Sequence, residues 1–166
     1  MGKIKYLVIA LFFVAAGTAA FYFVFDSREF MIKRQFGFIA EKIEKSSGES
    51  PVISIEKVNS LTKAIADPCL IHIPVYSYSR MTDSKDLSSY VHAMRSWYSK
   101  ISLIFHDFLF ENMDENSSQV TVTVKMKGAL NKGEIFEDIY DVSSRVQKIE
   151  GTWKLIEIKV AGVREK

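Results

Sequence analysis

The chain is poor in the residue types that build several common kinds of site. Of its 166 residues, one is cysteine, three are histidine and three are proline. The single Cys69 excludes an intrachain disulfide and any metal site made of paired cysteines. His72, His92 and His106 are spread along the chain without the spacing of metal ligands. The sequence therefore predicts neither a metal nor a cofactor.

Neither sign of charge is in clear excess. The formal net charge is +2, and the charged residues are interspersed rather than grouped. Nucleic-acid-binding domains usually carry a basic patch or stripe, so a nucleic-acid partner is not expected. Glycine-rich phosphate loops and nucleophile elbows are absent as well. With no internal repeat or proline-rich tract, the roughly 140 residues outside one apolar run predict a single domain.

The one long run without charge begins at Tyr6 and ends at Phe25. Twenty residues in a helix rise about 30 Å, which matches the hydrocarbon core of a bilayer. Lys3 and Lys5 precede the run, and the positive-inside rule then keeps the N-terminus in the cytoplasm. We therefore expect residues 1–26 to be a cytoplasmic stub with a transmembrane helix. Residues 27–166 would be a periplasmic domain held at a bacterial inner membrane.

A cleaved signal peptide is the alternative explanation of this run. Residues 18–20, Thr-Ala-Ala, are small enough for a cleavage site, and cleavage would give a secreted protein. The apolar run continues through residues 21–25, however, so the mature protein would begin with an exposed apolar segment. The pattern favours an uncleaved anchor.

Three amphipathic helices are predicted by apolar residues that recur every three or four positions. The first covers residues 28–45 after the cap Ser27. The second follows the cap Ser54 and stops at residues 67–68, because the residue before a proline is pushed out of the helical region. The third begins at Asp83 or Ser84. Tyr90 and Trp97 flank its apolar stripe and are interpreted as core packing.

Strands occupy most of the remaining chain. Residues 69–78 read as a strand in which Pro74 indicates an edge or a bend, and residues 101–110 form a strongly apolar strand. Residues 119–160 then predict an antiparallel meander with turns after Gly128 and at residues 150–151. Valine alternates with threonine and lysine in residues 120–127, which is typical of a sheet with one wet face. The order predicts an α+β fold with helices on one face of a curved, mostly antiparallel sheet.

Two short stretches resemble a known superfamily. They are Ile65-Ala66-Asp67-Pro68, before the first strand, and residues 149–155, in which Gly151 is followed by Thr152 and Trp153. Together with the order of elements, they resemble the nuclear transport factor 2-like superfamily, which includes ketosteroid isomerase-like and polyketide cyclase-like proteins. The resemblance covers about residues 28–161. It implies a cone-shaped domain whose cavity serves as an active site, a ligand pocket or a packed core.

Members of that superfamily with an N-terminal membrane helix include assembly factors of bacterial secretion machines. An isomerase-like member would need a carboxylate base and an oxyanion stabiliser within reach of one carbonyl. The candidates for lining the cavity are polar or aromatic residues of the predicted strands and third helix: Tyr76, Trp97, His106 and Tyr140, with Tyr78, Asp107 and Asp141 as further members.

Alternation along the strands limits which candidates can act together. It puts His106 on the side of Ile104 and Phe108, where a partly buried, hydrogen-bonded histidine is expected. Tyr140 shares its side with Asp138. Asp141 lies on the opposite face from Asp138, so those two carboxylates cannot act as a pair. No catalytic residue is predicted.

Two hypotheses about function follow. The first is a non-catalytic, membrane-anchored domain that holds a partner protein, or a second copy of itself, at the outer face of the membrane. The alternative is a small-molecule binding protein or an isomerase- or dehydratase-like enzyme that uses the cone cavity. The threonine- and lysine-rich side of residues 120–127 is a candidate docking face, although a solvated sheet face has the same pattern.

Overall fold

The computed structural model describes residues 27–74 and 77–163. Within them the chain forms three α-helices, one 3-10 helix and six strands. In order they are α2 (Arg28–Ile43), α3 (Pro51–Asn59), η1 (Ser60–Lys63), β1 (Ile65–Ile73), β2 (Tyr78–Thr82), α4 (Ser84–Ser96), β3 (Tyr98–Glu111), β4 (Ser117–Leu130), β5 (Ile135–Ile149) and β6 (Thr152–Val163).

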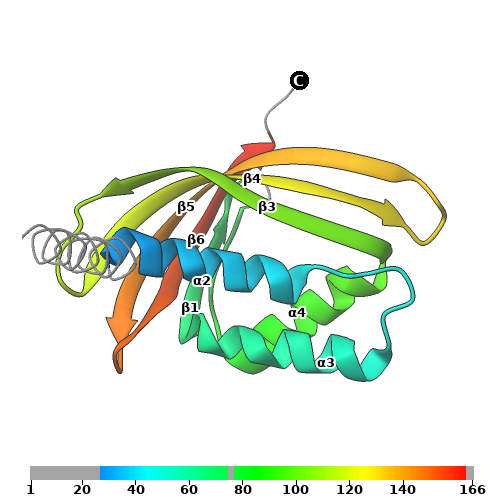
Figure 1. Ribbon diagram of the computed structural model, residues 1–166, viewed down its shortest axis with the longest axis horizontal. Coiled ribbons are helices and arrows are strands. Elements are labelled where there is room, and N and C mark those ends of the chain that lie inside the picture. The colour runs from blue at the N-terminus through cyan, green and yellow to red at the C-terminus, as the bar shows by residue number, and fades with distance from the viewer. Residues whose placement is uncertain (1–26, 75–76, 164–166) are drawn as a thin grey trace, which may run out of the picture.

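The strands form one sheet in the order β2-β1-β6-β5-β4-β3. The predicted meander is confirmed, because β4, β5 and β6 pair as antiparallel neighbours. The sheet is mixed, however, since β1 pairs with β6 in parallel. Figure 1 shows the helices on one side of the sheet, with β3 and β4 arching over α2. The α+β cone with three helices on a curved sheet is therefore confirmed for the described residues.

The first helix forms as its pattern predicts. The Ser27 hydroxyl accepts a hydrogen bond from the Phe30 amide at 3.3 Å and caps the N-terminus of α2. Ile32, Phe36 and Ile39 are buried on its inner face. The Phe36 ring meets the edges of the rings of Phe105 at 5.2 Å and Phe108 at 5.4 Å. This contact fastens α2 to the concave face of the sheet.

The second helix begins earlier than its sequence pattern predicted. Ser50, rather than Ser54, is its cap, and the Ser50 hydroxyl accepts from the Ile53 amide at 3.4 Å. Pro51 then occupies the first helical position, where its missing N–H costs nothing. The helix ends at Asn59 and passes into η1 instead of continuing to residue 66.

The first strand also begins earlier than expected. Asp67 and Pro68 lie inside β1, and the bond between them is cis, so the proline does not mark the end of a helix. Ile65 already pairs with Leu155 of β6, and regular pairing resumes at Leu70. The gap lies where Pro68 lacks an N–H for the ladder. Pro74 comes directly after the last residue of β1, which agrees with the predicted bend.

The predicted membrane helix cannot be compared with this fold, because residues 6–25 lie outside the described part of the chain. Among the helices of residues 27–74 and 77–163, none is long and apolar enough to cross a bilayer. The anchor and the location that depends on it stay predictions.

Candidate ligand-binding site

A mostly apolar pocket lies between helix α4 and two strands, the edge strand β2 and its neighbour β1. Its volume is about 370 Å³, and it is lined by Ile71, Ile73, Tyr78, Leu87 and Tyr90. We call it the Tyr78–Tyr90 pocket. The lining is apolar except for the two phenolic hydroxyls, which suits a ligand with one polar group.

The periodicities of strand and helix bring these five side chains together. Ile71 and Ile73 are two residues apart on β1 and therefore face the same side. Tyr78 of β2 stands directly opposite Ile73 in the antiparallel register. Leu87 and Tyr90 are three residues apart on α4, so they lie on neighbouring positions of one helix face.

Polar contacts fix α4 against the two strands. The Asp83 carboxylate accepts from the Asp86 amide at 2.8 Å and caps the helix. The Ser84 amide donates to Asp67 Oδ1 at 3.3 Å, which connects the start of α4 to β1. Arg80 of β2 and Asp86 of α4 form an ion pair at 3.7 Å. The walls of the pocket are thus held by contacts outside its lining.

The two tyrosines differ in their access to water. The Tyr78 hydroxyl oxygen is shielded from solvent and has no partner in hydrogen-bonding geometry. The Tyr90 side chain is 47% exposed. The Tyr78 hydroxyl lies near that of Tyr90 but outside good hydrogen-bonding geometry, and this poorly aligned hydrogen bond, followed by charge, raises the pKa of Tyr90 above its ordinary value of 10.0. The Tyr90 hydroxyl is therefore neutral near pH 7. A shielded hydroxyl without a well-formed bond is unfavourable, and a polar group that displaces the atoms covering it would satisfy it.

The one cysteine stands on β1 two residues before Ile71 but is not a nucleophile in this setting. Cys69 is 1% exposed. Burial, aided by the charge of Glu157, raises the pKa of its thiol to about 12. The reactive thiolate is therefore essentially absent at neutral pH.

Of the four residues chosen from the sequence, the three that the structure describes do not line this pocket. Tyr76 lies outside the described residues. Trp97 follows the last residue of α4 and is 65% exposed, so it is not the core residue it was interpreted to be. Tyr140 lies on the concave face against the core, where its hydroxyl donates to Asp138 Oδ2 at 3.3 Å. Its predicted alignment with Asp138 is confirmed.

His106 lies on the outer face of the sheet, not inside the cone. Leu103 and Phe105 pack inward, so His106 points outward with the exposed Ile104. The prediction that Phe108 shares this side is wrong. A bulge between His106 and Leu109, with Asp107 at φ 54°, inserts one extra residue and turns Phe108 back to the core.

The remaining polar candidates also belong to the outer face. His106 Nδ1 lies 2.8 Å from Asp107 Oδ2 at the surface. The Thr123 hydroxyl donates to Asp141 Oδ1 at 3.2 Å. In the described part of the chain, no three His, Cys, Asp or Glu side chains are grouped to hold a metal ion. These residues therefore do not join the Tyr78–Tyr90 pocket.

Sequence reasoning included Tyr78 among the cavity candidates but interpreted Tyr90 as helix packing. The signal for Tyr90 was its place three residues after Leu87, at the rim of the apolar stripe. Tyr90 faces side chains of β1 and β2. The pairing of these two strands cannot be read from the helical pattern around Tyr90.

Comparisons with known proteins identify the fold. No family model matches the chain, and no curated protein matches it. Among solved structures, a putative scytalone dehydratase from Novosphingobium aromaticivorans is 12% identical, with 81% of this chain and 83% of that chain covered and a TM-score of 0.64. The LinA-type3 hexachlorocyclohexane dehydrochlorinase from Novosphingobium barchaimii is 9% identical, with 81% and 85% covered and a TM-score of 0.64.

A third similar structure has a different kind of description. It is a putative calcium/calmodulin dependent protein kinase II association domain from Xanthomonas campestris, 10% identical, with 85% of this chain and 91% of that chain covered and a TM-score of 0.66. Identities this low show the shared fold and not a shared chemistry. The chain therefore shares the cone-shaped α+β fold of these solved structures, and its function must be argued from its own residues.

Proposed function

We propose that the protein binds a small, largely apolar molecule with one hydrogen-bonding group in the Tyr78–Tyr90 pocket. The observation that carries this proposal is the shielded Tyr78 hydroxyl without a well-formed hydrogen bond, at the wall of an otherwise apolar hollow. Three aliphatic side chains would hold the apolar body. The polar group of the ligand would hydrogen-bond to the tyrosine hydroxyls.

The size and the fold support this class of ligand. A volume of about 370 Å³ lies at the small end of the range of roughly 300–1,000 Å³ for ligand pockets. One protein with the same fold is named for hexachlorocyclohexane, a compact apolar ring. Two similar structures are described as a dehydratase and a dehydrochlorinase, which favours a pocket function over scaffolding.

Binding is proposed here rather than catalysis. A catalytic site of the isomerase or dehydratase type needs a positioned acid or base at the substrate. The carboxylate nearest in sequence to the lining residues of α4 is Asp86, which pairs with Arg80. The pocket lining itself offers two phenolic hydroxyls and no carboxylate or imidazole.

The test compares 1-naphthol with naphthalene as probes, using the full chain in a neutral detergent. Both probes should bind, and 1-naphthol more tightly. Tyr78→Phe should weaken 1-naphthol about fivefold, the effect of one net hydrogen bond of about 1 kcal/mol, and leave naphthalene unchanged. Tyr140→Phe is the matched control, because that hydroxyl bonds to Asp138 outside the pocket.

Two variants test the location. Leu87→Trp fills the pocket from α4, and Ile73→Trp fills it from β1 in case the first variant unfolds. Each should abolish binding of both probes while thermal unfolding shows a folded domain. Unchanged binding in a folded variant, or no binding to the unmodified chain, would rule out the proposed site.

Membrane-tethered partner binding is the second candidate function. It is favoured by the apolar run from Tyr6 to Phe25 and by exposed aliphatic side chains on α3, where Val52 is 74% and Ile55 50% exposed. In this proposal the N-terminus is cytoplasmic and the domain faces the periplasm of a bacterial cell. Carbonate-resistant membrane association, with protease cleavage of the domain only in opened cells, would support it. A light-scattering mass of one chain in detergent, with no retained protein, would count against it.

A further inference from the structure

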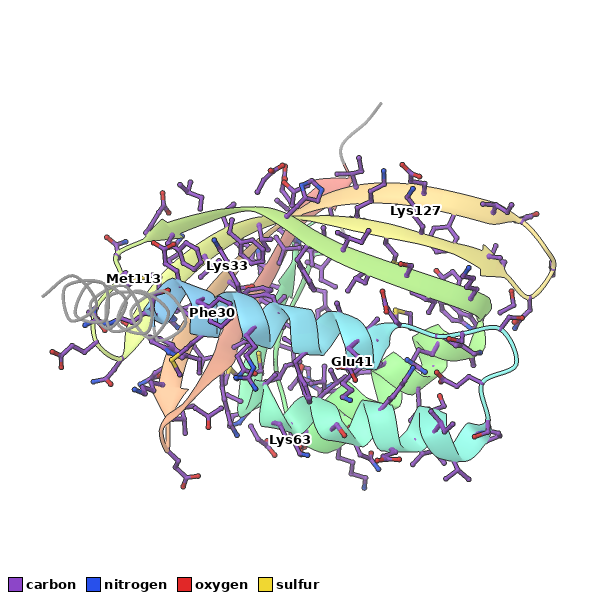
Figure 2. The ribbon with its side chains drawn as sticks, in the orientation of Figure 1. Phe30, Lys33, Glu41, Lys63, Met113 and Lys127 are labelled. Carbon is purple, nitrogen blue, oxygen red and sulfur yellow. The ribbon has the colours of Figure 1, made fainter. Side chains whose placement is uncertain are left out.

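A second hollow lies away from the Tyr78–Tyr90 pocket, between α2, η1 and the β5–β6 turn. Its volume is about 490 Å³. Three cationic side chains line it, and each comes from a different element: Arg34 from α2, Lys63 from η1 and Lys154 from β6. Figure 2 labels Lys63 on the lower side of the molecule, beneath α2. We call this hollow the basic groove.

The cations of the groove are largely free of internal partners. Within residues 27–74 and 77–163, neither the Arg34 guanidinium nor the Lys63 ammonium makes a hydrogen bond or an ion pair. Lys154 is half-buried, and its ammonium donates to the Thr62 carbonyl at 3.2 Å, which directs it across the groove wall. The one carboxylate in the lining is Glu150, so three cations and one carboxylate leave a charge of +2.

Two neighbouring lysines on the outer sheet face provide a comparison with the groove. Lys125 and Lys127 lie 2.7 Å and 2.8 Å from opposite oxygens of Glu137, so each ammonium there has an internal counter-ion. The groove places three cations beside one carboxylate in a concave surface, whereas the outer face places two cations beside one carboxylate. Converging cations in a hollow favour an anion, because the concave wall reduces solvent screening.

The lining also contains apolar side chains, beside the polar Gln35 and Thr152. Met31 and Phe38 of α2 and Ile149 at the end of β5 face the same hollow. An inorganic ion would leave these side chains in water. An anion attached to a hydrocarbon chain would contact both halves of the lining.

We propose that the basic groove binds the acidic head group of an amphiphile, a phosphate or carboxylate attached to an alkyl chain. The head group lies among Arg34, Lys63 and Lys154, and the first carbons of the chain lie on Met31 and Phe38. A bilayer lipid and a soluble acyl anion share this chemistry. Arg34 is six residues beyond Arg28, or about 9 Å along α2, and the apolar run ends three residues before Arg28. Under the proposal that this run spans a bilayer, a lipid head group would lie within reach of the groove.

Lysine acetylation measured by mass spectrometry tests this proposal on the full chain. In neutral detergent, hexyl phosphate should slow acetylation of Lys63 and Lys154, whereas inorganic phosphate should need at least tenfold higher concentration. Lys132, an exposed lysine in the β4–β5 turn, is the internal control and should react equally in every condition. Equal protection by hexyl phosphate and inorganic phosphate, or no protection, overturns the proposal.

Nanodiscs separate the two sources of the ligand. Protection of Lys63 in discs containing phosphatidylglycerol, but not in phosphatidylcholine discs, supports the bilayer lipid. Protection by hexyl phosphate alone supports the soluble amphiphile. Arg34→Gln should weaken hexyl phosphate about fivefold, as expected for one partly exposed charge contact. Arg145→Gln, a matched change on the exposed outer face, should leave protection unchanged. If both variants act alike, general surface charge explains the result and the groove does not.

Discussion

Replacing Arg95 with methionine should strongly destabilise the fold. Arg95 is 1% exposed on α4. Its Nη1 donates to the carbonyls of Lys42, Ile43 and Glu44 at 2.8, 2.7 and 2.8 Å, so it caps the C-terminus of α2. Its Nη2 bonds to Glu49 Oε1. One side chain thus joins α4, the end of α2 and the loop before α3.

The size of the effect follows from these contacts. Removing one partner of a buried ion pair costs about 3–5 kcal/mol, because it leaves the other charge uncompensated. Glu49 keeps its bond from Lys57 at 2.6 Å, which places the loss toward about 3 kcal/mol. For a domain of this size, that lowers the melting temperature by roughly 10 °C. Fluorescence of the buried Trp153 reports the transition in thermal and urea unfolding.

Arg145→Met is the matched control for this variant. Arg145 forms an ion pair with Glu157 at 3.2 Å, but its side chain is 59% exposed, so its loss should cost under about 1 kcal/mol.

The pH dependence of the free energy of unfolding gives a second check on the contacts of Glu49. Burial acts to raise the pKa of Glu49, but the bond from Lys57 and the charge of Arg95 outweigh it, so the pKa lies below 4.5. A depressed carboxyl pKa stabilises above pH 4.5, and this contribution is lost as the pH falls below that value. Equal losses in the free energy of unfolding for Arg95→Met and Arg145→Met would refute the reasoning.

Four further predictions follow from single sites. Gly128→Ala should destabilise by about 1–3 kcal/mol, because the new Cβ would lie 2.3 Å from the Lys100 carbonyl oxygen. Gly37→Ala in α2 meets no atom within 4 Å and should stabilise by about 0.5–1 kcal/mol. Urea unfolding measures both changes, and the reasoning is wrong if the free energy of unfolding shifts in the same direction in the two glycine variants. Hydrogen bonds from Lys125 and Lys127 lower the pKa of Glu137 to about 2, so NMR titration should find it ionised at pH 3, and Lys125→Met should raise its pKa toward 4.5. Cys69, with a pKa of about 12, should resist Ellman's reagent at pH 8 when folded and react rapidly in guanidinium; fast reaction of the folded chain would disprove its burial.

Most elements could be predicted because their signals are local. The apolar face of α2 and the alternation in β4 are periodic patterns that each segment carries by itself. The start of α3 was misjudged because both Ser50 and Ser54 are acceptable caps. Pro51 decided between them, since proline is favoured at the first helical position. The start of β1 was missed because the parallel pairing with β6 is a contact across about 90 residues that no local pattern reports.

The candidate site was less predictable than the fold. A single bulge at Asp107 moved Phe108 to the core while His106 stayed outside, and a bulge cannot be read from alternation. The Tyr78–Tyr90 pocket depends on how β2 pairs with β1 and how α4 packs beside them. Those are tertiary contacts, and the sequence shows only the residue types that take part.

The parallel pairing of β1 with β6 determines when the pocket can form during synthesis. Leu155 donates its amide to the Ala64 carbonyl at 2.8 Å, and Ile158 stands beside Ile71, a residue of the pocket lining. The strands β1 and β2 therefore have no sheet to join until the last strand has left the ribosome. All five lining residues have been synthesised once residue 90 is added, but the pocket can form only after residues 152–163 have been synthesised. A chain shortened before β6 would keep every lining residue and lose the binding site.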